Sequence, residues 1–228
     1  MNDAALDFAR DGVAVIAGVL TPAHCDALCD RVAQAVDASG APGTRSLLAQ
    51  DWCRTLAAGL RAHPGIAPLV GAGHVAVQCT YFEKSAGRNW LVPIHQDLAI
   101  PVAARVDHPG LRGWSYKDGS LFVQPPAEVL EQLVAVRVHL DPCHAQDGPL
   151  RFLPGTQKLG RIGAADAGGF KSGGAMVAPV LERGDVLAMR PLVLHASSRA
   201  TGTGRRRVLH FVFGPASLPH GLAWEFAL

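Results

Sequence analysis

The sequence lacks the features that mark several large classes of protein. No apolar run approaches the roughly 18 uncharged residues that a membrane span needs, and the acidic, polar start has neither part of a secretion signal. The five cysteines contain no CxxC pair, so a disulfide framework is not expected. Because 21 Lys and Arg nearly balance 19 Asp and Glu, the net charge does not indicate a nucleic-acid partner. We therefore expect a cytoplasmic protein that binds neither membranes nor nucleic acids.

Signatures of common enzyme classes are also missing. There is no GxGxxG after a predicted strand, no P-loop, no GxSxG elbow and no HExxH, so nothing supports the sites that these motifs build. What the chain does have is the means to form a large core. Hydrophobic residues make up 49% of its 228 residues and charged residues 18%, which excludes disorder over most of the length. A single domain over 1–228 is expected.

The hydrophobic pattern changes character along the chain. Residues 1–72 are predicted to be mainly helical, with Thr21 as an N-cap and Pro22 in the first helical position. Residues 73–215 carry apolar, alternating runs separated by turn signals, which predicts a β core. The expected fold is therefore mostly β, a sandwich or barrel with flanking N-terminal helices. Two long glycine-rich regions, 98–130 and 160–175, are predicted to be lid loops.

One spacing among the ten histidines points to a metal site. In an extended strand, His95 and Asp97 of the HQD motif would point to the same face, so an imidazole and a carboxylate would converge. Together they would supply two-thirds of a facial triad for ferrous iron, and His195 is the best candidate for the third ligand. His139 and Asp141 have the same spacing, so the HxD motif alone does not identify the site.

The segment after His195 suggests a second function for this region. Residues 205–211 are predicted to form a strand in which Arg206 faces the opposite way from Arg205 and Arg207. An inward Arg206 would be placed to bind a carboxylate near the metal, with Ser197 adding a hydrogen bond. The alternative is a solvated basic cluster at a hairpin, and both interpretations stand on these residues alone.

Four motifs in order resemble the phytanoyl-CoA dioxygenase (PhyH) family of Fe(II)- and 2-oxoglutarate-dependent oxygenases. They are DGVAVIAGVLTPAHCDAL, NWLVPIHQD, DGPLRFLPGTQKLG and GDVLAMRPLVLHASS, the last followed by Arg206 at the family's usual offset. The resemblance covers most of the chain. It implies a double-stranded β-helix core, also called a cupin-like jelly-roll. It also implies Fe(II) as cofactor, 2-oxoglutarate as co-substrate and O2 as oxidant.

The resemblance also assigns roles residue by residue. It implies a structural or pocket-lining role for His139 and Asp141, which precede the DGPLRFLPG turn. The implied metal ligands are His95, Asp97 and His195. The residues implied for binding 2-oxoglutarate are Arg206 at its C5 carboxylate, Ser197 in support, Gln78 one strand upstream, and Lys84 with Asn89 for the same task or for substrate.

The implied reaction oxidises a C–H bond of a small organic molecule and releases succinate and CO2. Hydroxylation is the default outcome, and desaturation or ring formation is left open. Two other functions remain as alternatives: a cupin-like metalloenzyme that does not use 2-oxoglutarate, and a non-catalytic β-barrel binding protein. Arg137 alternates with Ala135 and His139 on a predicted core strand, where it could pair with a substrate carboxylate. A monomer or homodimer is expected.

Overall fold

The computed structural model describes residues 6–36, 43–172 and 175–228. The N-terminal part of the chain is mainly helical and flanks the β core, as the sequence predicts. The Thr21 hydroxyl accepts a hydrogen bond from the His24 amide and Pro22 is the first helical residue, so the predicted cap is confirmed. The α-helices are α1 (Phe8–Asp11), α2 (Pro22–Ala35), α3 (Asp51–Ala62), α4 (Ala67–Val70), α5 (Ala127–Leu130) and α6 (Ala164–Ala167). The short 3-10 turns are η1 (Leu47–Ala49), η2 (Ala145–Asp147), η3 (Thr156–Leu159) and η4 (Gly169–Ser172).

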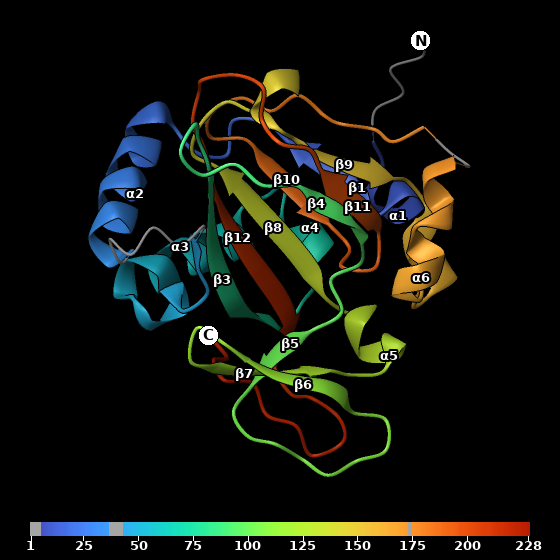
Figure 1. Ribbon diagram of the computed structural model, residues 1–228. Helices are drawn as coiled ribbons and strands as arrows, with labels where there is room; N and C mark the ends of the chain where they lie inside the picture. The colour runs from blue at the N-terminus through green and yellow to red at the C-terminus, as the bar shows by residue number, and fades with distance from the viewer. Residues whose placement is uncertain (1–5, 37–42, 173–174) are drawn as a thin grey trace.

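The main framework is a six-stranded antiparallel sheet. Its order is β1 (Val13–Ile16), β10 (Val186–Met189), β8 (Val134–His139), β12 (Arg206–Pro215), β3 (His74–Lys84) and β2 (Gly43–Thr44). A smaller sheet lies across from it, in the order β4 (Val92–His95), β11 (Leu194–Ser197) and β9 (Leu150–Leu153). Strands near in space are far apart in sequence, and the two sheets form the cupin-like jelly-roll (Figure 1).

The two faces of the larger sheet differ in chemistry. Its outer face carries alternate apolar residues, such as Val136 on β8 and Phe211 on β12, which pack in one buried cluster with side chains of α2 and α3. Both helices cover this face in Figure 1. Along the same strands, the residues that alternate with these apolar ones face inward toward the smaller sheet, and they include Arg137 and His210. The helices therefore bury the apolar face, while the inner face is left for polar side chains.

The two predicted lid loops contain more regular structure than the sequence indicates. Within 98–130, a third sheet forms in the order β5 (Ile100–Val102), β7 (Ser120–Gln124) and β6 (Arg112–Lys117). It lies below the barrel in Figure 1. Within 160–175, α6 and η4 form, while 173–174 lie outside the described residues. A movement of either region remains a prediction.

One of the apolar runs that predict strands within the β core, 176–181, does not form a strand in the part of the chain that the structure describes. The apolar run at 176–181 makes only single bridges, through Val177 and Leu181, and no continuous strand forms there.

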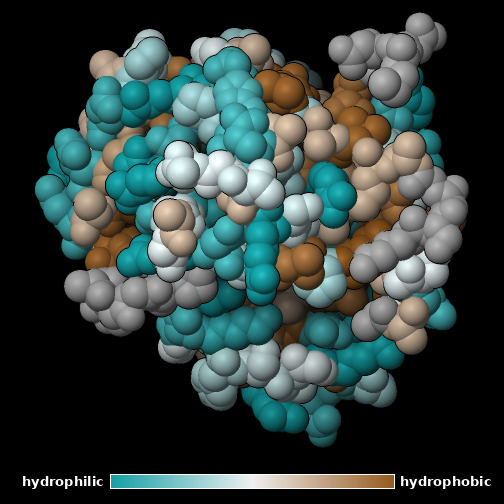
Figure 2. Space-filling view, turned by 45° about the horizontal axis from the view of Figure 1, so that its top comes forward, coloured by the Kyte–Doolittle hydropathy of each residue, from teal (hydrophilic) through white to brown (hydrophobic). Residues whose placement is uncertain are grey.

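Among the described helices, none combines the length and the apolar character required to traverse a lipid bilayer. The apolar residues visible in Figure 2 gather mainly on the right, the side that carries α6 in Figure 1.

Candidate active site

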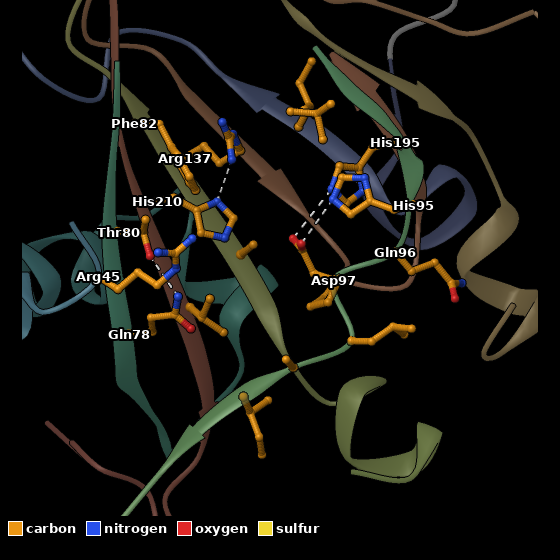
Figure 3. A pocket seen from close by; sticks show the side chains of 18 of the residues that line it. Arg45, Gln78, Thr80, Phe82, His95, Gln96, Asp97, Arg137, His195 and His210 are labelled. Atoms are coloured by element: carbon orange, nitrogen blue, oxygen red, sulfur yellow. Dashed lines mark hydrogen bonds and ion pairs between the residues drawn. The ribbon is translucent and has the colours of Figure 1, made fainter. Parts of the chain in front are cut away.

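Two antiparallel strands bring together three potential metal ligands. His95 ends β4 and lies directly opposite His195 on β11, so the two rings are neighbours, with centroids 4.2 Å apart. Asp97 follows two residues later, where its amide donates to the carbonyl of Pro191 at 2.9 Å. One ligand atom from each of the three side chains lies within 4.8 Å of the others. Figure 3 shows the two imidazoles and the carboxylate turned toward one another. The structure thus brings together the three residues that the sequence predicts.

Hydrogen bonds orient both imidazoles toward the carboxylate. Nδ1 of His95 lies 2.8 Å from the carbonyl of Pro93, and Nδ1 of His195 lies 2.8 Å from the carbonyl of Val193. Because a carbonyl only accepts, each Nδ1 must carry the proton and each Nε2 is left with a free lone pair. Each Nε2 lies 3.7 Å from an oxygen of Asp97. This arrangement presents two nitrogens and a carboxylate to one point.

The electrostatics of the three groups are consistent with that geometry. Burial lowers the pKa of His195 to about 4, although Asp97 opposes the change. Burial also disfavours charge on Asp97, but the two imidazoles outweigh it and hold its pKa well below the ordinary value. Burial disfavours the charged form of His95, but Asp97 and the backbone hydrogen bonds of Pro93 and His195 together outweigh it and raise the pKa of His95 above its ordinary value. The Asp97 side chain keeps 41% of its surface exposed, because it faces a cavity.

A second cluster, of Arg206, Lys84 and Ser197, lies at one end of the same cavity. Arg206 and Lys84 are direct partners across β12 and β3, and both side chains are almost fully buried. Lys84 donates to the hydroxyl of Ser197 and to the carbonyl of Ser198. Arg206 donates to the carbonyl of Gly148 at 2.9 Å, while its buried Nε has no partner among the described residues. Among the described residues, neither of these two neighbouring cations forms an ion pair with a carboxylate.

Burial makes this cluster sensitive to the charge of a ligand. Desolvation, together with the neighbouring Arg206, lowers the pKa of Lys84 to about 7. Desolvation also lowers the pKa of Arg206. Arg205 and Arg207 point away and pair with Glu83 and Asp141 respectively. Arg206 therefore points inward, and the solvated basic cluster is not formed: Arg205 is exposed, whereas Arg207 is largely buried in its ion pair with Asp141.

The structure does not bring Gln78 and Asn89 to this cluster. Gln78 lines the cavity and donates to the hydroxyl of Thr80 at 2.8 Å, but it precedes Lys84 by six residues, roughly 20 Å along a strand. Asn89 makes two hydrogen bonds of 2.8 Å with the backbone of Ala200, one in each direction. It therefore holds the loop after β11.

Both clusters open into one cavity of about 530 Å³. Sequence reasoning missed several of its walls, among them Arg45 and Lys117. Arg45 forms an ion pair of 2.7 Å with Asp118, which joins the N-terminal flank to the β6–β7 hairpin. Lys117 lies over the ring of Phe122 at 5.1 Å. Neither cation has a sequence signal that separates it from ordinary surface charge.

The fold and this donor set define a jelly-roll protein with a His-Asp-His site of the kind found in iron- and 2-oxoglutarate-dependent enzymes. The comparison with family models then identifies the family. The model for phytanoyl-CoA dioxygenase (PhyH) matches residues 8–208, so the chain belongs to that family. It is an oxidoreductase of the iron- and 2-oxoglutarate-dependent dioxygenase class. No curated protein gives a significant match to the sequence.

Solved structures share the fold at low sequence identity. HygX from Streptomyces hygroscopicus, determined with nickel and 2-oxoglutarate bound, is 18% identical, with a TM-score of 0.63 over 91% of this chain and 84% of its own. SnoN, a non-heme alpha-ketoglutarate-dependent epimerase from nogalamycin biosynthesis, is 18% identical, with a TM-score of 0.66 over 94% and 83%. EctD from S. alaskensis, in its apoform, is 16% identical, with a TM-score of 0.67 over 100% and 85%.

Proposed function

We propose that this dioxygenase hydroxylates a C–H bond of a small organic molecule held in the 530 Å³ cavity. In this proposal His95, Asp97 and His195 hold the iron, and Arg206, Lys84 and Ser197 bind the C5 carboxylate of 2-oxoglutarate. The observation that carries it is the presence of both clusters on the walls of one cavity. A single oxygenase domain over 1–228 and a cytoplasmic location belong to the same proposal.

The three ligand residues fit ferrous iron by their chemistry. Two imidazoles and one carboxylate on one side of a metal leave further positions open, which is the donor set of non-heme iron oxygenases. The backbone carbonyls that accept from each Nδ1 fix the ring orientation before any metal arrives. The side chain of Asp97 faces the cavity and is available to the metal.

The second cluster fits the distal carboxylate of 2-oxoglutarate. The Nε of Arg206 is buried without a partner, and a buried unsatisfied donor of this kind is stabilised when a ligand oxygen accepts from it. A guanidinium binds a carboxylate in two parallel hydrogen bonds, and the ammonium of Lys84 adds charge on the neighbouring strand. A metalloenzyme that does not use 2-oxoglutarate would have no need of these buried cations.

Iron and 2-oxoglutarate, when bound, would allow O2 to act as the oxidant: one oxygen atom goes to the C–H bond of the substrate, and the other goes to 2-oxoglutarate, which is released as succinate and CO2. The residues of this chain position the reactants and restrict water. Arg206 and Lys84 hold one end of the co-substrate so that its other end reaches the three ligands. The surrounding walls, such as Phe122 and Leu133, keep the substrate in place beside them.

An anaerobic titration tests this function. Fe(II) and then 2-oxoglutarate are added to apo protein, and the visible charge-transfer band of the chelate is recorded for the wild type, His195→Ala and Arg206→Ala. We expect a band in the wild type, none in His195→Ala, and a much higher 2-oxoglutarate requirement in Arg206→Ala. Bound iron without a band would favour the metalloenzyme that does not use 2-oxoglutarate, and absence of iron binding would favour the non-catalytic barrel. The mass in solution tests the expected monomer or homodimer.

A further inference from the structure

Arg137 is a buried cation that the proposed iron and 2-oxoglutarate sites leave unused. It lies on the inner face of β8, lines the cavity and keeps only 6% of its surface exposed. Its Nη1 lies 2.8 Å from Nδ1 of His210, and its guanidinium stands 5.6 Å from the centre of the Phe82 ring. These contacts orient the side chain within the cavity, as Figure 3 shows.

One edge of this guanidinium has no protein partner. Nε is buried and unsatisfied, and the bond to His210 uses Nη1, so the Nε–Nη2 edge is free among the described residues. That edge is the one that binds a carboxylate through two parallel hydrogen bonds. Burial and the nearby Arg206 lower the pKa of Arg137 to about 10, so it remains charged at neutral pH. An unpaired charge in this position is costly unless a ligand compensates it.

The sheet register separates Arg137 from the 2-oxoglutarate cluster. Arg137 is paired with His210, whereas Arg206 is paired with Lys84, and four residues along β12 correspond to roughly 13 Å. The hydrogen bond to His210 holds the guanidinium near its own row of the sheet. The two arginines therefore start from different rows of the sheet, and the effect of Arg137→Met on 2-oxoglutarate affinity tests whether they bind separate carboxylates.

The charges that line the cavity point to an anionic substrate. The described lining residues include five cationic side chains and a single carboxylate, that of Asp97. The cations are Arg45, Lys84, Lys117, Arg137 and Arg206. In the proposed function Asp97 binds the metal and Asp118 pairs with Arg45, so the two charges of 2-oxoglutarate do not balance the four remaining cations and the iron. Positive charge is left over where the substrate must bind.

We propose that Arg137 binds a carboxylate of the substrate, and that the enzyme acts on small organic acids. The inference rests on the proposed function and names its substrate class. Arg137 is then a substrate-positioning residue: it holds the acid group on the inner face of the larger sheet and presents another part of the molecule to the three ligands. His210 holds the guanidinium in place through the bond at Nη1.

The test uses the anaerobic enzyme already loaded with Fe(II) and 2-oxoglutarate. Straight-chain carboxylic acids from acetate to octanoate, and the matching primary amides, are titrated while the charge-transfer band is recorded. We expect one or more acids to shift the band, with the matching amide binding at least tenfold more weakly. In Arg137→Met the acid should bind no better than the amide, while the 2-oxoglutarate affinity stays within threefold of wild type. Arg137→Lys should restore part of the preference.

Arg205→Met is the matched control for Arg137→Met. It removes an exposed arginine that lies one residue before β12 and pairs with Glu83, and it should leave the acid preference unchanged. The band formed with 2-oxoglutarate shows that each variant is folded. The inference is overturned if no acid shifts the band, if amides bind equally well, or if Arg137→Met weakens 2-oxoglutarate as much as Arg206→Met does. A wild-type enzyme that forms no band before any acid is added contradicts the proposed function itself, which is a separate observation.

Discussion

Two HxD motifs in this chain have the same spacing but different surroundings. His95 ends β4 and Asp97 lies two residues beyond it; both face a cavity, and 37% and 41% of their side-chain surfaces are exposed. His139 is 3% exposed, and Asp141 accepts three hydrogen bonds from Arg207, at 2.9, 2.7 and 2.7 Å. The first pair therefore has free ligand atoms, whereas the carboxylate of the second is already occupied.

The neighbouring strands explain the difference. β4 is paired with β11, which carries His195 opposite His95 and so supplies a third ligand. β8 lies between β10 and β12, which bring Arg207 to Asp141 and no further ligand to His139 among the described residues. A short motif thus becomes a metal site through the strand beside it, and the spacing alone does not decide its role.

The largest contrast between the two motifs should appear in iron binding. Asp97→Asn removes the anionic ligand, so we expect Fe(II) affinity to fall by at least about 100-fold and turnover to be lost. Asp141→Asn should bind Fe(II) within about threefold of wild type, because its carboxylate serves Arg207. Anaerobic equilibrium dialysis with Fe(II) measures both. Retention of iron by Asp97→Asn, or its loss from folded Asp141→Asn, would reverse the assignment.

The neighbouring arginines give the next contrast. Arg206→Met should weaken 2-oxoglutarate binding on the order of 50-fold, because hydrogen bonds to charged groups contribute about 1.5–3 kcal/mol. Arg205→Met should change it less than about twofold, since that side chain pairs with Glu83 on the other face. The charge-transfer titration measures both affinities. Equal losses in the two variants would show that overall charge, rather than the inward position of Arg206, controls binding.

Stability should distinguish the motifs in the opposite sense. Asp141→Asn leaves the largely buried Arg207 without its carboxylate, and we expect the free energy of unfolding to fall by about 2 kcal/mol. Asp118→Asn is the matched control, because its ion pair with Arg45 is exposed and contributes under about 0.5 kcal/mol. Urea unfolding of the apo protein reports both values. A similar, small effect of the two substitutions would remove the structural role given to Asp141.

The smallest predicted effect concerns pH. Burial, with Arg137 and Arg206 nearby, holds the pKa of His139 well below its ordinary value. Below pH 6.5 the unfolded chain binds a proton at this residue that the folded chain does not, so stability falls as the pH falls, by up to about 1.4 kcal/mol per pH unit. Burial also lowers the pKa of His210 to about 3, which adds a slope of the same sign. His139→Asn should have a shallower slope than wild type.

Urea unfolding of the apo protein between pH 6.5 and 5 measures these slopes. His24→Asn, on an exposed face of α2, is the control and should keep the wild-type slope. An unchanged slope in His139→Asn would mean that this histidine is not held neutral in the folded protein.

Local signals in the sequence predicted much of the fold. Thr21 and Pro22 marked the start of α2 because capping depends on neighbouring residues alone. Alternation predicted most strands of the core, because one face of each is buried under the helices. The third sheet was missed because β6 is largely exposed and contains a register shift between Arg112 and Ser115, so its alternation is broken.

The candidate site was predictable only in part, for a related reason. Strand alternation put Arg206 on the face opposite Arg205 and Arg207, but the residues alone did not decide which face lies inside, and the resemblance to the family supplied that choice. The choice between the two HxD motifs could not come from spacing, because it depends on which strand lies beside each. Arg45 and Lys117 were missed because they approach the cavity from separate elements, and only the assembled fold brings them to its wall. Pairings between distant strands carry this information, and no single segment contains it.

The central claim is that His95, Asp97 and His195 hold the iron while His139 and Asp141 do not. Anomalous diffraction at the iron absorption edge, from crystals prepared anaerobically with Fe(II) and 2-oxoglutarate, tests it most directly. We expect one strong anomalous peak between the Nε2 atoms of His95 and His195 and the carboxylate of Asp97. Electron density for the co-substrate should extend from this peak to Arg206. A peak beside His139, or iron bound away from Asp97, would contradict it.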